Sequence, residues 1–307
     1  MPPRMVRREG LQCLGLEGLA MAETQFPPPG ACDCHVHVIG PKRRYPLAPD
    51  HRYTPMDAPV GQLAAMLKRL RLDRVVIVQP SFYGTDNACT LDAMAELGNA
   101  RGVAVVAPDA AESEIDTLND QGVRGLRVNV ASAGGASAEA TRAALNAAAA
   151  QCAIHGWHVQ IFVSAQALEP LAPILSALPV DTVIDHFGLV SPAADDGARK
   201  TLLRLVESGK VWVKISGAYR MAEDYNDPRI GPLARALCAA NPERIVWGSD
   251  WPHTPPHTLR PAAPETELPF QDIDPGDLLA LVPRWLEDDA LVHRVLVDNP
   301  ARLYGFE

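Results

Sequence analysis

The stretch RVVIVQP, residues 74–80, decides the fold. Four β-branched residues follow one another in it, and a proline ends the run. A strand with one face in water alternates apolar and polar residues, whereas this run is apolar on both faces. Such a run is typical of a strand in a parallel sheet that is covered on both sides. The run GVAVVAP, residues 102–108, has the same character.

Strand-like runs of this kind alternate with helix-like segments along the chain. The strand candidates are Ala31–Ile39, Arg74–Gln79, Val103–Ala107, Gly125–Val130, His158–Val163, Thr182–His186, Val211–Ile215 and Ile245–Ser249. Alternating strands and helices form a parallel sheet. Eight such units predict an α/β fold, a single-domain (β/α)₈ barrel of the TIM type, over residues 28–307. No GxGxxG or P-loop motif follows a strand, which argues against a nucleotide-binding fold.

The composition excludes several classes of protein. The 307 residues are 47% hydrophobic and carry a net charge of -9, with no basic run that would indicate a nucleic-acid surface. No apolar stretch is long enough to span a membrane. The six cysteines form no CxxC pair, so we expect reduced thiols in a cytoplasmic protein. We expect residues 1–27 to be a disordered leader. No pattern in the sequence indicates which oligomeric state the protein adopts.

Polar residues stand where the predicted strands end. They are His35 and His37 in DCHVH, Arg127 in GLRVNV, His186 in DHFG, and Asp250 in GSDWPH. The carboxyl ends of the strands of a barrel meet at one face, which carries the active site in barrel enzymes. We therefore expect these side chains to converge. Two proline-rich stretches, 41–59 and 251–270, follow the first and last strands and are expected to form lids over that face. We expect His253, in the second stretch, to be solvated.

Three of these motifs carry a family resemblance. DCHVH (33–37), DHFG (185–188) and GSDWPH (248–253) together resemble the amidohydrolase superfamily, and within it the lactonase branch around 2-pyrone-4,6-dicarboxylate hydrolase. The resemblance covers residues 28–305. Supporting stretches are YPLAPDHRYTP (45–55), VQPSFYGTDN (78–87) and GVRGLRVN (122–129).

The resemblance implies that the protein opens the ring of a small anionic lactone. Asp250 would act as the general base on water, and His35, His37 and His186 would donate hydrogen bonds to the carbonyl oxygen as it becomes an oxyanion. Arg127 would hold an acidic group of the substrate in a charge-assisted contact. By the same resemblance, Tyr53, Ser81 and Arg220 would share in binding that group.

The resemblance also bears on metal binding. Metal-bearing amidohydrolases typically add a histidine at the end of the fifth strand, where this sequence has Phe162 and Ser164. Arg127 would repel a dication. We therefore expect a metal-independent enzyme without a cofactor. If zinc is present, its ligands would be His35, His37, His186 and Asp250.

The substrate and the reaction stay open at this point. Relatives often carry an arginine where this chain has Leu189, so the pocket is less cationic than one built for a dicarboxylate. A substrate with one carboxylate, a sulfonate or a sugar acid fits as well as a pyrone dicarboxylate or a muconolactone. The alternatives are an isomerase acting on a sugar-acid lactone, a zinc-dependent decarboxylase and a non-enzymatic binding protein.

Overall fold

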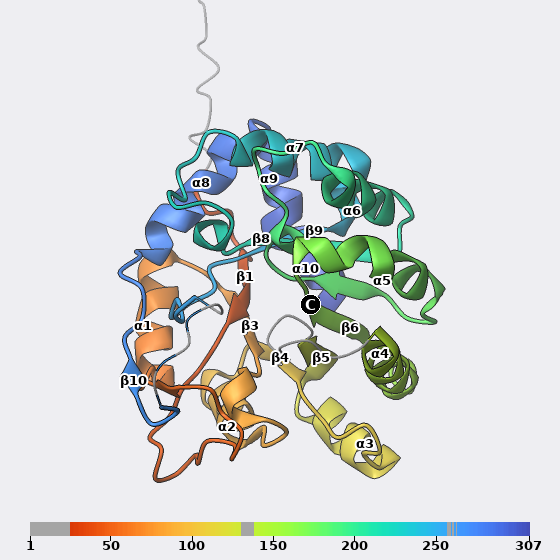
Figure 1. Ribbon diagram of the computed structural model, residues 1–307. Helices are drawn as coiled ribbons and strands as arrows, with labels where there is room; N and C mark the ends of the chain where they lie inside the picture. The colour runs from red at the N-terminus through yellow and green to blue at the C-terminus, as the bar shows by residue number, and fades with distance from the viewer. Residues whose placement is uncertain (1–24, 130–137, 257–258, 260, 262) are drawn as a thin grey trace, which may run out of the picture.

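The prediction of a (β/α)₈ barrel is confirmed. The computed structural model describes residues 25–129, 138–256, 259, 261 and 263–307. One sheet of eight parallel strands has the order β1 (Cys32–Val36), β3 (Arg74–Val78), β4 (Ala100–Ala104), β5 (Val123–Asn129), β6 (His158–Phe162), β7 (Thr182–Ile184), β8 (Val211–Ser216) and β9 (Ile245–Gly248). The strands surround the centre of the molecule in Figure 1.

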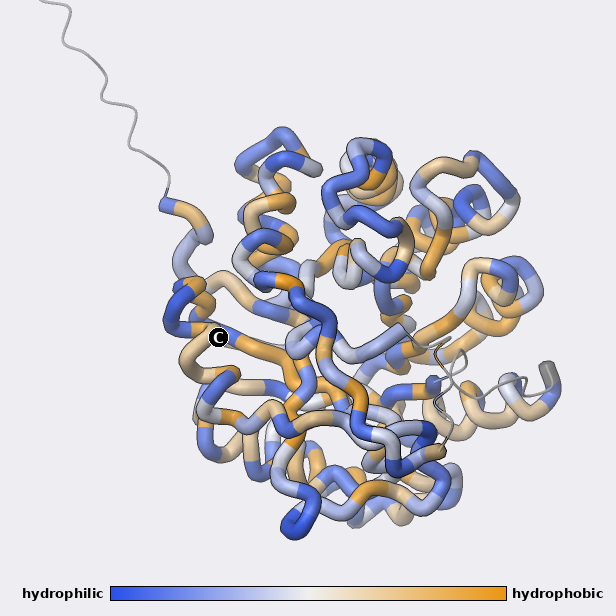
Figure 2. The backbone as a smooth tube through the Cα atoms, turned by 60° about the vertical axis from the view of Figure 1, so that its left-hand side comes forward, coloured by the Kyte–Doolittle hydropathy of each residue, from blue (hydrophilic) through white to orange (hydrophobic). Residues whose placement is uncertain are grey.

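Helices form the outer layer of the barrel (Figure 1). They are α1 (Val60–Leu70), α2 (Ala88–Leu97), α3 (Glu112–Asp120), α4 (Ala138–Ala153), α5 (Ala165–Ala177), α6 (Gly197–Glu207), α7 (Ile230–Ala240), α8 (Pro275–Leu286), α9 (Asp289–His293) and α10 (Asn299–Tyr304). Hydrophobic stretches lie mostly in the interior and hydrophilic ones at the outer turns (Figure 2). Among the described residues, no helix is both long enough and apolar enough to cross a membrane.

The barrel closes at a seam between β1 and the end of β9. The backbone N–H of Asp250 donates to the carbonyl of His35 over 2.8 Å, and that of His37 donates to the carbonyl of Trp251 over 2.8 Å. The carboxylate of Asp33 accepts from the N–H of Ser249 at 2.9 Å. The seam therefore holds the HxH segment directly beside Asp250.

The two seam strands approach each other closely at Gly248. A Cβ built there would lie 2.6 Å from Cβ and 2.7 Å from the backbone nitrogen of His35. We expect Gly248→Ala to lower the free energy of unfolding by about 1–3 kcal/mol, the usual cost of overpacking. Urea unfolding would measure it. In the matched control Gly61→Ala, a Cβ on α1 would meet nothing within 4 Å, so stability should not fall. Equal stability of the two variants would contradict the close approach.

Several predicted strands end earlier than expected, and β4 is displaced as a whole towards the N-terminus. We predicted Val103–Ala107, whereas β4 spans Ala100–Ala104. The side chain of Asn87 takes the place of a strand neighbour at Val105, since its Oδ1 accepts from the Val105 N–H at 3.0 Å and its Nδ2 donates to the Val105 carbonyl at 2.8 Å. A side chain from the preceding loop thus ends the ladder within an apolar run.

The two proline-rich stretches are joined to each other. β2 (Thr54–Pro55) from the first pairs in parallel with β10 (Glu267–Leu268) from the second. Nζ of Lys42 lies 2.9 Å from Oε2 of Glu267 beside this ribbon. Residues 257, 258, 260 and 262 of the second stretch lie outside the described residues.

The folded part of the chain begins before residue 28. Phe26 packs against the core, and its carbonyl accepts a hydrogen bond from Nη2 of Arg71. The leader predicted over 1–27 lies outside the described residues as far as residue 24. Residues 25–27 therefore accompany the barrel.

Candidate active site

The four residues predicted to be catalytic come together at the carboxyl ends of the strands. The ring centroid of His35 lies 5.0 Å from that of His37 and 4.7 Å from that of His186. The carboxylate of Asp250 faces all three rings: its Oδ1 is 3.8 Å from Nε2 of His35 and 3.7 Å from Nε2 of His37, and its Oδ2 is 3.8 Å from Nε2 of His186. All four are buried.

Backbone conformation helps to aim two of these side chains. Asp250 has φ +64° just after β9, and His186 has φ +52° just after β7. Residues other than glycine rarely adopt this left-handed region, and such residues cluster at functional sites. Both strands therefore end in turns that direct a polar side chain across the barrel mouth.

The two oxygens of Asp250 have different surroundings. Oδ2 accepts from the hydroxyl of Tyr219 at 2.7 Å and from Nε of Arg220 at 2.5 Å. Oδ1 is buried and has no hydrogen-bond partner among the described residues. Burial alone would raise the pKa of Asp250, but the guanidinium of Arg220 holds it well below its usual value. The site thus presents an ionised carboxylate with one oxygen anchored and the other bare.

Hydrogen bonds at Nδ1 constrain the histidine protons. Nδ1 of His37 lies 2.7 Å from the carbonyl of Val78, and because a carbonyl only accepts, this nitrogen carries a proton. Nδ1 of His186 lies 2.9 Å from the hydroxyl of Ser216, which can donate or accept. Burial lowers the pKa of His37 and of His186 well below the usual value, which favours neutral rings. Neutral His37 therefore presents a lone pair at Nε2.

A charged network fills the barrel beneath the histidines. Asp185 lies at its centre, with Oδ1 3.3 Å from Nδ1 of His35 and 3.8 Å from Nζ of Lys214, and with Oδ2 3.6 Å from Nη2 of Arg127. The Lys214 side chain is fully buried, and burial lowers its pKa to about 8. Barrel interiors are usually filled with Val, Ile and Leu. This interior is polar directly below the site.

The predicted anion-binding residues have different environments. Arg220 contacts Asp250 and also donates from Nη2 to Oγ1 of Thr254 at 3.1 Å. Tyr53 lies within the electrostatic reach of Arg220, and burial raises the pKa of its hydroxyl to about 12. Arg127 is engaged with Asp185 and with the carbonyl of Gln79, to which its Nη1 donates at 3.1 Å. Ser81 is exposed at the start of η1 (Ser81–Tyr83), just after β3, with no side-chain hydrogen bond to these groups among the described residues.

From the sequence alone, no role was assigned to Tyr219, Lys214 or Asp185. Lys214 had a visible signal, since it is the one charged residue within the apolar run VWVKIS, residues 211–216. Tyr219 precedes Arg220, and nothing in the sequence alone marked it. The expectation that His253 is solvated is wrong: its side chain is buried, and its ring lies 5.6 Å from that of Tyr219.

Residues 32–306 match the family described as Amidohydrolase. The chain belongs to this family. Among curated proteins, this amidohydrolase is 35% identical to a 4-sulfomuconolactone hydrolase from Hydrogenophaga intermedia, over 96% of this chain and 95% of that protein. It is 35% identical to a 2-pyrone-4,6-dicarboxylate hydrolase from Comamonas testosteroni, over 90% of both chains.

A solved structure supports the same assignment. A probable 2-pyrone-4,6-dicarboxylic acid hydrolase from Acinetobacter baumannii, crystallised with citric acid bound, superposes with a TM-score of 0.75 and 28% identity. The match covers 90% of this chain and all of that one. The suspected resemblance to the lactonase branch is confirmed by these matches.

The amidohydrolase has donor sets that could hold a metal ion. His35, His37 and Asp250 form one set, and His35, Asp185 and His186 form another, with the ligand atoms of each set within 4.8 Å of one another. Oδ1 of Asp250 and Nε2 of His35 are buried polar atoms without a hydrogen-bond partner among the described residues, and both atom types can ligate a metal. The donor chemistry therefore fits zinc.

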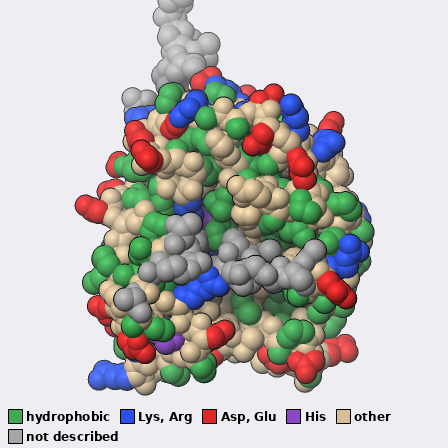
Figure 3. All heavy atoms as spheres, viewed as in Figure 1, with side chains coloured by type: hydrophobic (Ala, Val, Ile, Leu, Met, Phe, Trp, Pro, Cys, Tyr) green, Lys and Arg blue, Asp and Glu red, His purple; other side chains and the backbone are tan. Residues whose placement is uncertain are grey.

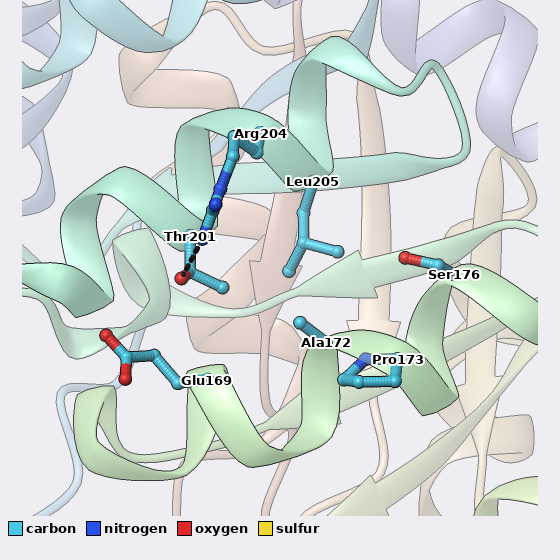
Figure 4. A pocket seen from close by; sticks show the side chains of 7 residues that line it. All are labelled: Glu169, Ala172, Pro173, Ser176, Thr201, Arg204 and Leu205. Carbon is cyan, nitrogen blue, oxygen red and sulfur yellow. Dashed lines mark hydrogen bonds between the residues drawn. The ribbon is translucent and has the colours of Figure 1, made fainter.

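A hollow on the outer wall of this amidohydrolase is a different kind of feature. It has a volume of about 480 Å³ and lies between α5 and α6 (Figure 4). Its described lining contains no histidine or aspartate, and its Arg204 donates to Oγ1 of Thr201 at 3.0 Å. On the face shown in Figure 3, charged side chains lie mostly around the periphery. The described lining of this hollow therefore carries neither histidine nor aspartate, the residue types of the four side chains that the structure brings together at the barrel mouth.

Proposed function

We propose that this amidohydrolase hydrolyses the ester bond of a small anionic lactone without a metal ion. The observation that carries the proposal is the bare Oδ1 of Asp250, which is buried, ionised and surrounded by three imidazoles. A carboxylate in this state can take a proton from water. The names of the relatives, both lactone hydrolases, support the reaction class.

Asp250 serves as the general base in this scheme. A water molecule beside Oδ1 attacks the lactone carbonyl and gives its proton to Oδ1. The tetrahedral intermediate collapses with cleavage of the bond between the carbonyl carbon and the ring oxygen. Oδ1 then returns the proton to the departing ring oxygen, which leaves a hydroxy acid and regenerates the carboxylate.

The histidines stabilise the negative charge on the carbonyl oxygen. His186 donates from Nε2 as a neutral ring, because the Ser216 hydroxyl can donate to its Nδ1. His37 already uses its Nδ1 proton on the Val78 carbonyl, so it donates from Nε2 only in the doubly protonated form. The resemblance implied that all three histidines donate in the same way. In this scheme His186 donates as a neutral ring, whereas His37 donates only when it is doubly protonated. The role of His35 is considered separately below.

The acidic group of the substrate binds at Arg220. Nη1 of this arginine is buried and has no hydrogen-bond partner among the described residues. Tyr53 and Thr254 lie beside it and add hydroxyl donors. Nη1 of Arg127 donates to the carbonyl of Gln79, whereas Nη1 of Arg220 has no partner among the described residues, so the site is suited to a substrate with one acidic group near Arg220. One relative is named for a sulfonated lactone, and another was crystallised with citric acid. The acidic group at Arg220 is therefore a sulfonate or a carboxylate.

Charge balance favours a reaction without metal. The buried side chains around the histidines comprise three cations, Arg127, Lys214 and Arg220, and three carboxylates, Asp33, Asp185 and Asp250. These charges balance one another, and a dication would add two positive charges with no further buried carboxylate beside the histidines among the described residues. If zinc does bind, one of the two donor sets described above, which share His35, would hold it. The ion would then act as a Lewis acid.

The first experiment is proton release from a panel of anionic lactones by chelator-treated protein, repeated with zinc added. The panel spans 2-pyrone-4,6-dicarboxylate, muconolactones, a sulfonated muconolactone and aldarolactones. We expect turnover after chelation, with no gain from zinc. Turnover only with zinc would contradict metal independence. Product without ¹⁸O from labelled water would identify an isomerase, and carbon dioxide release a decarboxylase.

We also propose that the protein works in the cytoplasm. Its described cysteines are free and buried, and Sγ of Cys32 and Sγ of Cys34 lie 3.7 Å apart without a bond. Unpaired thiols persist in a reducing compartment. Fractionation of cells that express the natural gene would test this assignment.

A further inference from the structure

We propose that Asp185 is a positioning residue that keeps the proton of neutral His35 on Nδ1, so that Nε2 of His35 accepts a hydrogen bond from the hydrolytic water. The inference rests on the hydrolysis proposed above and assigns a place to its water molecule. Asp185 does not touch the substrate in this scheme and acts only through His35.

The contact between the two side chains requires a proton. Nδ1 of His35 and Oδ1 of Asp185 face each other at 3.3 Å, and both are fully buried. Neither atom has a hydrogen-bond partner among the described residues, so the contact is a close approach of the two polar atoms rather than an aligned hydrogen bond. An unprotonated Nδ1 would direct a lone pair at a carboxylate oxygen, which is repulsive. The proton of the neutral ring therefore lies on Nδ1.

The surrounding network holds Asp185 ionised and in place. Gln160 donates from Nε2 to Oδ2 of Asp185 at 3.1 Å. Lys214 and Arg127 supply positive charge from two other strands, and Lys214 is itself fixed by the carbonyl of Cys34 at 2.8 Å and by Oε1 of Gln160 at 2.7 Å. Each member is anchored by another, so the carboxylate has little freedom to turn away from His35.

The opposite side of the His35 ring faces the bare oxygen of Asp250. Nε2 of His35 and Oδ1 of Asp250 lie 3.8 Å apart, and neither has a hydrogen-bond partner among the described residues. Both atoms are closed to solvent in this structure, so the water must enter together with the substrate. At about 2.8 Å from each atom it would donate a proton to both. Its lone pair then points away from the two acceptors, towards a bound carbonyl carbon. Two fixed acceptors thereby orient the water for attack.

The decisive measurement is ¹⁵N NMR of His35 in the chelator-treated, substrate-free protein, assigned by loss of its signals in His35→Gln. We expect a protonated Nδ1 and an unprotonated, pyridine-like Nε2. This measurement needs no active substrate, so it decides the inference even if every lactone in the panel is inert. A proton on Nε2 with Nδ1 bare would overturn it.

The kinetic test is Asp185→Asn, in which the amide can donate to Nδ1 and reverse the tautomer. We expect kcat to fall on the order of 10³- to 10⁴-fold, as when the aspartate of a His–Asp pair is changed to asparagine, with KM nearly unchanged. The ¹⁵N signals of His35 should show the proton moved to Nε2. An unchanged kcat or an unchanged tautomer in the folded variant would overturn the proposal.

A matched control separates positioning from general damage. Asp181→Asn makes the same substitution four residues away on the same segment, where the carboxylate contacts Nε1 of Trp212 and Nη1 of Arg244 outside the site. We expect this control to keep kcat and the tautomer of His35. If Asp181→Asn lost as much activity as Asp185→Asn, the specific role of Asp185 would be refuted.

Discussion

Replacing Asp250 by asparagine is expected to lower kcat by about 10²- to 10⁴-fold, the contribution of a positioned general base. The amide keeps the size of the side chain but cannot take a proton from water at Oδ1. Steady-state turnover of the best lactone in the panel measures the loss. Since the base acts in the transition state, KM should change much less than kcat.

Asp250→Asn also leaves Arg220 without its carboxylate, so folding must be checked beside activity. Removing one partner of a buried pair costs about 3–5 kcal/mol of stability. Tyr219→Phe is the matched comparison, because it deletes one hydrogen bond to Oδ2 and keeps the carboxylate. We expect it to retain most of kcat. Wild-type turnover in folded Asp250→Asn would show that another group is the base.

Replacing Arg220 by methionine is expected to have two separable effects. The loss of a charge-assisted contact worth about 1.5–3 kcal/mol should raise KM by about 10- to 150-fold for an anionic lactone. The loss of a cation beside Asp250 should raise the pKa of this carboxylate, which Arg220 now helps to depress. The ionised form would then be lost at a higher pH as the pH falls, so the acid limb of kcat/KM should move upward.

Profiles of kcat/KM against pH for the wild type and Arg220→Met would show both effects. Arg244→Met is a control of the same chemistry, because this guanidinium stacks on Trp212 and pairs with Asp181 away from the site. It should leave KM and the acid limb in place. An unchanged KM in Arg220→Met would place the acid-binding position elsewhere, with Arg127 as the next candidate.

The fold was predictable because it depends on local patterns. Continuous Val and Ile runs identified the strands, and their alternation with helices defined the barrel. The end of β4 was not predictable, because it depends on the side chain of Asn87 reaching Val105 from a preceding loop. A hydrogen bond from one distant side chain produces no periodic pattern in the sequence, so it cannot be predicted from hydrophobic periodicity.

The site was predictable only where residues stand at strand ends. His35, His37, His186 and Asp250 do so, and the structure brings them together. Which way β1 side chains face was harder to predict. Cys32 and Cys34 lie in one buried cluster with Val76 and Val246, as regular alternation along β1 requires. His35 lies between Asp33 and Val36, where the pairing of β1 is irregular, and its side chain also reaches Asp185 in the barrel.

The seam between β1 and β9 also has a consequence for folding. The bond between Ser249 and Asp33 spans 216 residues, and Lys42 and Glu267 of the loop ribbon are 225 residues apart. Contacts this distant carry a large loop-closure entropy until the intervening units are in place. Asp250 meets His35 only across this seam, so the recovery of activity during refolding should report the last closure of the barrel and lag behind the recovery of helical circular dichroism.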